Sequence, residues 1–298
     1  MGLSRRLQAD LCIVGLSAIW GCTFVVSKRA LDEISPLLFI AVRFAVASSV
    51  LVFLIPRGSL ASLSRGGLPR AGIVTGLLLF TGFVFQTTGL QHTTPSRSAF
   101  ITGMYVIFTP LLALLLRMRG PSLNSIVGAI LAAVGLYLLT APQAGGSGFG
   151  TGETLTLLCA LAFSGHLLAV DHYTRRHDAR SVAFLQILTV AVLAIAAAGL
   201  LETPRLILSP GLVAALVVTS LLATALALYV LNLVQSWTTP TRAAIIFAAE
   251  PVFAALTSWV VEGEVLSRAA VIGAILILAG MLTAEIGPFP RRRAQAAL

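Results

Sequence analysis

Ten apolar segments, each about as long as a bilayer is thick, account for most of the chain. Clusters of proline, glycine and arginine separate them, and their approximate ranges are 9–29, 37–56, 70–91, 97–117, 122–141, 152–173, 181–201, 210–235, 241–261 and 266–287. A helix needs roughly 20 mainly apolar residues to cross the hydrocarbon core of a membrane. The sequence therefore predicts an all-α membrane protein with ten transmembrane helices and no soluble domain.

The composition supports a lipid environment. Of the 298 residues, 57% are hydrophobic and only 10% are charged, whereas a soluble domain carries about 25% charged residues. The net charge of +9 is not the footprint of a nucleic-acid partner, because the basic residues lie mostly in short connections between spans. The three cysteines lie inside spans without CxxC spacing, which argues against a disulfide framework or a zinc site. We expect no metal and no cofactor; the expected partners are membrane lipid and a small-molecule substrate.

The distribution of basic residues predicts how the spans are oriented. Ten spans leave both termini on one side of the membrane. With Arg43 set aside as intramembrane, the connections on the side of the termini hold fourteen basic residues and the others hold five. Because basic residues accumulate in cytoplasmic loops, both termini are expected in the cytoplasm, in a multi-pass protein of the inner membrane. Arg5 and Arg6 precede a first span that lacks a signal cleavage site, so this span is expected to remain uncleaved.

An internal repeat becomes visible when the chain is shifted by 145 residues against itself. Thr93–Arg97 (TTPSR) then falls on Thr238–Arg242 (TTPTR). The same shift aligns two pairs of glycines of a kind that allows close helix packing: Gly128 with Gly273 and Gly135 with Gly280. A repeated motif and paired glycines at one offset indicate a duplication rather than chance similarity between apolar spans.

The duplication predicts two halves of five spans. Residues 1–143 form the first repeat, residues 144–151 a Gly-rich connection, and residues 152–298 the second repeat. Because five is odd, the second half must enter the membrane upside down relative to the first. Inverted repeats of this kind are a transporter architecture, with the substrate site in a central cavity near the midplane.

Two prolines lie in the middle of spans. Pro110 matches Pro251 if the register between the halves slips by four residues, and the same slip places Thr109 opposite Glu250. Proline removes a backbone donor and kinks a helix. Paired kinks are candidate flexing points for helix gating in alternating access; the alternative is a static shape.

At this point the sequence resembles a known family. Trp20-Gly21 in the first span, Pro36 followed by Arg43-Phe44 in the second, and the two Thr-Pro-x-Arg segments are similar to motifs of the drug/metabolite transporter superfamily, and the ten-helix repeat is similar to its EamA-type members. Within them the chain looks most like the YddG-type exporters. The resemblance implies a secondary transporter that exports amino acids or related metabolites. The second half departs from the first, because Ser164-Gly165 stands in the position equivalent to Trp20-Gly21.

Two charged residues within spans are candidates for the transport chemistry. Glu250 lies about 13 Å into the ninth span, close to the bilayer centre. Burial there favours the protonated acid, so Glu250 is the candidate for proton coupling; the alternative is a structural carboxyl group. Arg43 lies about 10 Å from the outer face. It is expected to bind a substrate carboxylate or, alternatively, to form a structural ion pair or snorkel.

Uncharged polar and aromatic residues within spans suggest a moderately polar interior. His166 is either a proton relay or a histidine satisfied by a neighbouring helix. With the residues above, the predicted substrate pathway comprises Trp20, Arg43, Gln86, Tyr105, Phe163, His166, Tyr229 and Asn232. Each of these side chains alone is also compatible with helix–helix packing.

An enzyme and a passive facilitator are the alternatives to a carrier. His166, Asp171 and His172 point in different directions on a helix and make a poor catalytic or metal site, so an enzyme is not expected. A passive facilitator or channel for small metabolites is the more serious alternative to a carrier, although an intramembrane carboxyl group and paired kinks favour the carrier. A monomer suffices, because the two halves are already fused.

Overall fold

The computed structural model describes residues 4–54, 66–118, 121–140, 150–263 and 267–286. Within these residues the fold is helical, apart from one isolated β-bridge between Ile34 and Leu206. Most of the predicted Gly-rich connection, residues 144–149, lies outside the described part. The helices are α1 (Arg5–Ala30), α2 (Pro36–Leu54), α4 (Leu68–Gln91), α5 (Pro95–Thr102), α6 (Tyr105–Leu115), α7 (Leu123–Thr140), α8 (Thr151–Thr174), α9 (Ala179–Leu201), α10 (Pro210–Ser220), the π-helical turn η1 (Leu221–Leu226), α11 (Ala227–Gln235), α12 (Pro240–Phe247), α13 (Glu250–Glu262) and α14 (Arg268–Ile286).

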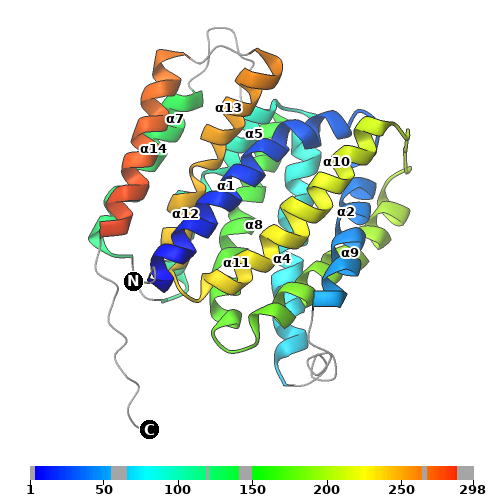
Figure 1. Ribbon diagram of the computed structural model, residues 1–298, viewed down its shortest axis with the longest axis horizontal. Coiled ribbons are helices and arrows are strands. Elements are labelled where there is room, and N and C mark those ends of the chain that lie inside the picture. The colour runs from blue at the N-terminus through cyan, green and yellow to red at the C-terminus, as the bar shows by residue number, and fades with distance from the viewer. Residues whose placement is uncertain (1–3, 55–65, 119–120, 141–149, 264–266, 287–298) are drawn as a thin grey trace.

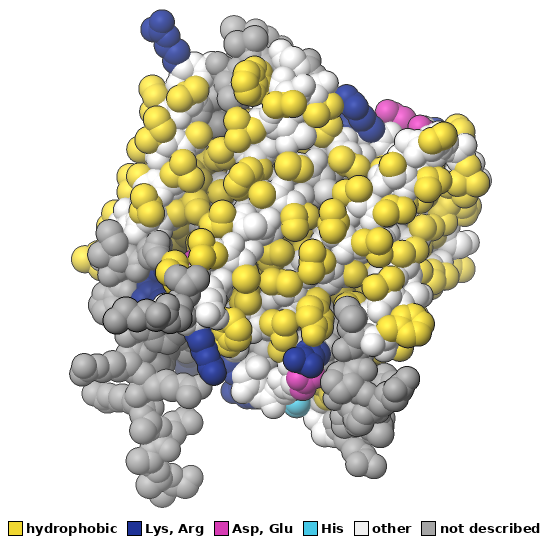
Figure 2. All heavy atoms as spheres, viewed as in Figure 1, with side chains coloured by type: hydrophobic (Ala, Val, Ile, Leu, Met, Phe, Trp, Pro, Cys, Tyr) yellow, Lys and Arg dark blue, Asp and Glu magenta, His cyan; other side chains and the backbone are white. Residues whose placement is uncertain are grey.

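These elements form the predicted ten spans. Eight helical segments are long and apolar enough to cross a membrane, and α7 and α14 contain two shorter apolar stretches that complete the ten. The fourth span combines α5 with α6, the eighth α10 with η1 and α11, and the ninth α12 with α13. Large apolar side chains stay exposed around the bundle, as at Phe53, Leu200 and Val260. Figure 2 shows them over the middle of one face, with charged side chains toward its upper and lower edges.

The two halves pack as an inverted pair. Equivalent spans lie against each other, with α2 on α9, α7 along α14, and α6 against α12. The first span of each half packs on the fourth span of the other half: α1 packs on α12 and α13, while α8 packs on α5 and α6 (Figure 1). We call the end of the bundle at which α1 begins the N-terminal face. Because the total of ten spans is even, the last span, α14, ends at this face (Figure 1).

Helix breaks interrupt the fourth and ninth spans at equivalent places. The N–H of Met104 donates to Ile101 O and that of Ala249 to Ile246 O, three residues back instead of four. Both breaks fit the 145-residue shift, so the four-residue slip expected from the prolines is not needed. Pro110 lies inside α6, whereas Pro251 lies in the first turn of α13. The two prolines are therefore not structural equivalents, and in each span the helix break precedes the proline.

The aligned glycines form a reciprocal contact between α7 and α14. A Cβ atom added at Gly135 would lie 2.6 Å from Gly273 O, and one added at Gly280 would lie 2.6 Å from Gly128 O. Gly135 on α7 thus packs against the backbone carbonyl of Gly273 on α14, and Gly280 on α14 packs against that of Gly128 on α7. Because only a residue without a Cβ fits at this distance, the glycines set how closely the two spans approach.

The repeated Thr-Pro-x-Arg motif starts a helix in each half. The side chains of Thr94 and Thr239 accept from the backbone N–H of Arg97 and Arg242, respectively, and the proline between takes the first helical position. Threonine satisfies an N–H group that a helix start leaves free, and proline lacks one. The motif therefore fixes where α5 and α12 begin, at opposite faces of the bundle.

Candidate functional site

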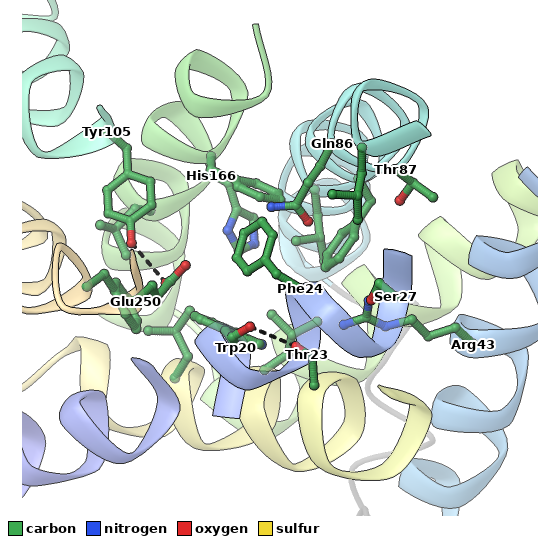
Figure 3. Close-up of a pocket in the computed structure, with 18 residues that line it drawn as sticks. Trp20, Thr23, Phe24, Ser27, Arg43, Gln86, Thr87, Tyr105, His166 and Glu250 are labelled. Atoms are coloured by element: carbon green, nitrogen blue, oxygen red, sulfur yellow. Dashed lines mark hydrogen bonds between the residues drawn. The ribbon is translucent and has the colours of Figure 1, made fainter. Parts of the chain in front are cut away.

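A cavity lies between the two halves (Figure 3). Its lining residues run from the middle of the bundle away from the N-terminal face. On α1, its lining begins at Trp20 and continues toward the far end of the helix at Ser27. On α4, it runs in the same direction from Leu79 to Leu90. Its wall also includes side chains from the second, fourth, sixth, eighth and ninth spans: Arg43, Tyr105, Phe163, His166, Leu167, Leu228, Leu231, Phe247 and Glu250.

The structure brings most of the predicted pathway residues to this cavity. The predicted residues that line it are Trp20, Arg43, Gln86, Tyr105, Phe163, His166 and Glu250. Tyr229 and Asn232 do not line it. On α11 the cavity is lined by Leu228 and Leu231. Tyr229 and Asn232 each directly follow one of these leucines, so their side chains are rotated from it by about 100° around the helix axis. Asn232 is fully buried and donates to Leu228 O within its own helix, while Tyr229 packs against the hydrophobic core.

Several lining residues were not anticipated from the sequence. Thr23, Phe24 and Ser27 follow Trp20 on one face of α1, and Phe83 and Thr87 lie on the lining face of α4. Their spacing of three or four residues is the signal that was available, because it places side chains on one face of a helix. Starting from Trp20 and Gln86, this spacing would have led to Thr23, Phe24, Ser27 and Phe83, and from Phe83 to Thr87.

Tyr105 and Glu250 meet on one side of the cavity. The Tyr105 hydroxyl donates to Glu250 Oε1 at 2.9 Å, and both side chains are nearly inaccessible to bulk solvent. The helix breaks place them, since Tyr105 is the first residue of α6 and Glu250 the first of α13. Within the described part of the chain, no hydrogen bond is made by Glu250 Oε2. This oxygen is free to accept from a proton donor that enters the cavity.

Arg43 lies on the other side, as Figure 3 shows. Its Nε–H donates to Thr224 Oγ1, and its Nη2–H donates to Ala223 O at 3.2 Å. Both acceptors belong to η1, where a π-helical turn widens the eighth span; such turns are frequent at functional sites. Trp20 Nε1–H also donates to Ala223 O, at 2.8 Å. The guanidinium carbon lies 4.7 Å from the centroid of the Phe83 ring, a cation–π distance.

His166 reaches the cavity wall and is held by another helix. Its Nε2 lies 2.9 Å from Gln186 Oε1 on α9, and both side chains are buried. The contact fits the interpretation of a histidine satisfied by a neighbour, while the rest of the ring lines the cavity. Asp171 is engaged elsewhere, in an ion pair with Arg175 one turn away. Across the described residues, no group of three His, Cys, Asp or Glu side chains is arranged to hold a metal ion.

Comparisons with known proteins identify a family, a relative and a shared fold. The model of the EamA-like transporter family matches this chain twice, at residues 7–141 and 150–284. An uncharacterized transporter from Archaeoglobus fulgidus is 34% identical over 282 residues, which cover 95% of this chain and 87% of that protein. A solved structure described only as the crystal structure of a protein has a TM-score of 0.77 at 20% identity. The match covers 93% of this chain and 96% of the other and shows a shared fold.

Proposed function

Because the chain belongs to the EamA-like transporter family, we propose that it exports small amphipathic metabolites, above all neutral and aromatic amino acids, by alternating access. Membership of this family makes it a multi-pass membrane transporter of small substrates and not an enzyme. The direction of transport follows the YddG-type exporters that the sequence resembles.

The lining of the cavity is the observation that carries the choice of substrate. Aromatic rings from Trp20, Phe24 and Phe163 form much of its wall, with one carboxyl group and one guanidinium group set apart within it. Aromatic and apolar walls bind an apolar side chain, and a few placed polar groups orient the ligand. An amino acid with an apolar side chain offers the matching ammonium and carboxylate groups.

Glu250 is our candidate for coupling transport to protons. Its carboxyl group faces the cavity and keeps one oxygen without a partner among the described residues. A proton and a substrate ammonium group would compete for this oxygen, so occupation by one releases the other. Such competition couples the movement of protons in one direction to the movement of substrate in the other, which is what proton-driven export requires.

The arrangement in the membrane is also part of the proposal. We place the N-terminal face in the cytoplasm of a cell with an inner membrane, on the charge distribution of the connections. We take residues 1–143 and 152–298 as the two repeats, consistent with the two family matches at residues 7–141 and 150–284. The fused halves enclose the cavity within one chain, so we propose a monomer.

Transport into proteoliposomes tests the proposed function. Vesicles preloaded with unlabelled phenylalanine should accumulate labelled phenylalanine by counterflow, and the rate should saturate with substrate. A pH gradient should change the accumulation at equilibrium. A passive facilitator would instead give uptake that does not saturate and an equilibrium that ignores the gradient. Failure of a panel of neutral amino acids, with activity toward another solute, would overturn the substrate class.

A further inference from the structure

A buried ion pair joins the two halves near the N-terminal face. Arg242, near the start of α12, donates from Nε to Asp10 Oδ1 at 2.8 Å and from Nη2 to Asp10 Oδ2. The two side chains are 5% and 9% exposed, respectively. Asp10 lies on α1 in the first half, so this two-point contact ties the first span of one half to the ninth span of the other.

A second ion pair occupies the equivalent place at the opposite face. Arg97 Nη1, near the start of α5, lies 3.5 Å from Glu153 Oε1 on α8. Glu153 also accepts from the Thr93 hydroxyl at 2.7 Å and from the Gly150 backbone N–H at 3.0 Å. Arg97 and Arg242 are the arginines of the repeated Thr-Pro-x-Arg motif. In each half this arginine meets an acid near the start of the first span of the other half.

The two ion pairs differ in how far their arginines are exposed to solvent. Arg97 is 38% exposed, whereas Arg242 is 5% exposed. The cavity lining extends from the middle of the bundle toward the side of the Arg97 pair and includes no residue of the Arg242 pair. The more exposed pair therefore lies at the end toward which the cavity extends, and the buried pair lies at the end that the cavity does not reach.

The faces of two helices that line the cavity continue past it toward the Asp10–Arg242 ion pair. On α1, Trp20 is preceded on the same face by Ser17, Ile13 and Asp10, at spacings of three or four residues. On α11, Leu228 and Leu231 are followed on that face by Gln235, which is fully buried. Asp10 and Gln235 thus lie on the extension of the route that the cavity begins.

Buried polar groups without partners lie along this extension. Asn232 Oδ1 on α11 and Thr238 Oγ1 just before α12 are both inaccessible and make no hydrogen bond within the described part of the chain. Leaving a buried polar group without a partner carries a free-energy cost. The cost disappears if water enters this region in another conformation, which gives a physical reason for polar residues here.

We propose that Asp10–Arg242 and Glu153–Arg97 are alternating closures of one transport pathway, and that Gln235, which is buried here, lines its N-terminal half. Separating α1 from α12 opens the N-terminal half, and separating α8 from α5 opens the other. The proposal rests on the alternating access of the proposed function, but not on the identity of the substrate.

Cysteine accessibility tests this proposal in membrane vesicles of both orientations. The background carries Ala in place of Cys12, Cys22 and Cys159, all of which are free thiols. Gln235→Cys reports the N-terminal half of the pathway and Thr87→Cys reports the cavity. A membrane-impermeant methanethiosulfonate reagent is applied from each face. Asp10→Asn should raise labelling at position 235 from the N-terminal face about tenfold, because removing one partner of a buried ion pair destabilises the closed state.

The same substitution should lower labelling at position 87 from the opposite face, since opening one end closes the other. Glu153→Gln should leave position 235 protected. Exchanging the charges, with Asp10→Arg and Arg242→Asp together, should restore protection at position 235. Asp178→Asn is the matched control, because Asp178 contacts Ser181 within its own half; it should change neither label.

Unchanged labelling at both positions in monodisperse Asp10→Asn protein would overturn the closure. So would labelling at position 235 that rises equally in the charge-exchanged protein, because the pair would then have no role in sealing. If the labels shift as expected but neutral amino acids are not transported, the closure stands and the proposed substrate fails. Saturable amino-acid counterflow without any shift in labelling would overturn the closure alone.

Discussion

Tyr105 and Glu250 are hydrogen-bonded to each other across a sequence separation of 145 residues, which is the repeat shift itself. Each is the first residue after the helix break of its span, and each is the structural counterpart of the other. Two equivalent residues of an inverted repeat can touch only close to the axis that relates the halves. A carboxyl group on that axis is about equally far from both faces, so it is placed to exchange protons with either side in turn.

Glu250→Gln should uncouple transport from the pH gradient while leaving exchange intact. Glutamine keeps the length of the side chain and an oxygen that accepts from Tyr105, but it cannot exchange a proton. Accumulation driven by a gradient of one pH unit, which is about tenfold for one proton per substrate, should fall to the equilibrium level. Counterflow of labelled phenylalanine in the same proteoliposomes should persist.

Tyr105→Phe is the companion variant. It removes the hydroxyl group that donates to Glu250 but leaves the carboxyl group able to titrate, so coupling should survive with a rate reduced by about tenfold, as expected for one hydrogen bond to a charged group. Gradient-driven accumulation that is unchanged in Glu250→Gln would contradict the coupling role.

Helix boundaries and the duplication were predictable because they follow from patterns along the chain. Span length and the breaks at proline, glycine and arginine clusters predicted where helices begin, and the helix at Pro95 starts within two residues of the expected position 97. The duplication, read from repeated residues such as Gly135 and Gly280, correctly predicted two inverted halves. All of these signals are local or periodic, so one sequence contains them.

Side-chain orientation was less predictable, because it depends on how each helix is rotated against its neighbours. Asn232 was expected in the pathway but does not line this cavity, while Leu231 beside it does. The prolines suggested Thr109 as the counterpart of Glu250, yet the helix breaks make it Tyr105. Asp10 drew no attention in the sequence, because its partner Arg242 lies 232 residues away.

Arg43→Gln should weaken binding of substrates that carry a carboxylate. Arg43 is anchored on η1 and lies within cation–π distance of Phe83, so its charge stays in the cavity wall. Losing a charge-assisted hydrogen bond should raise the half-saturating concentration of phenylalanine about tenfold. Phenylalaninamide, which lacks the carboxylate, is the matched substrate and should be affected little. An equal loss for both compounds would assign Arg43 a structural role.

Gly135→Ala and Gly280→Ala should each destabilise the protein. The added methyl groups would lie 2.6 Å from Gly273 O and Gly128 O, respectively, so α7 and α14 would have to separate. Overpacking of this kind costs about 1–3 kcal/mol, visible as a lower Tm in detergent. Gly15→Ala is the control, because an added Cβ there meets nothing within 4 Å. A Tm for the Gly135 variant equal to that of the control would contradict the close packing.

Glu202→Ala should loosen the connection between the second and seventh spans at the face opposite the N-terminal one. The carboxylate of Glu202 accepts from the backbone N–H groups of Leu37 and Leu38 and from the Ser35 hydroxyl, at 3.2, 2.7 and 2.8 Å, respectively. It thus caps the start of α2 from the end of α9, where a negative charge also favours the helix dipole. We expect a loss of about 2 kcal/mol in the free energy of unfolding, measured by thermal denaturation in detergent. Ser35→Ala completes a double-mutant cycle. Strictly additive effects of Glu202→Ala and Ser35→Ala would show that the cap does not couple the two helices.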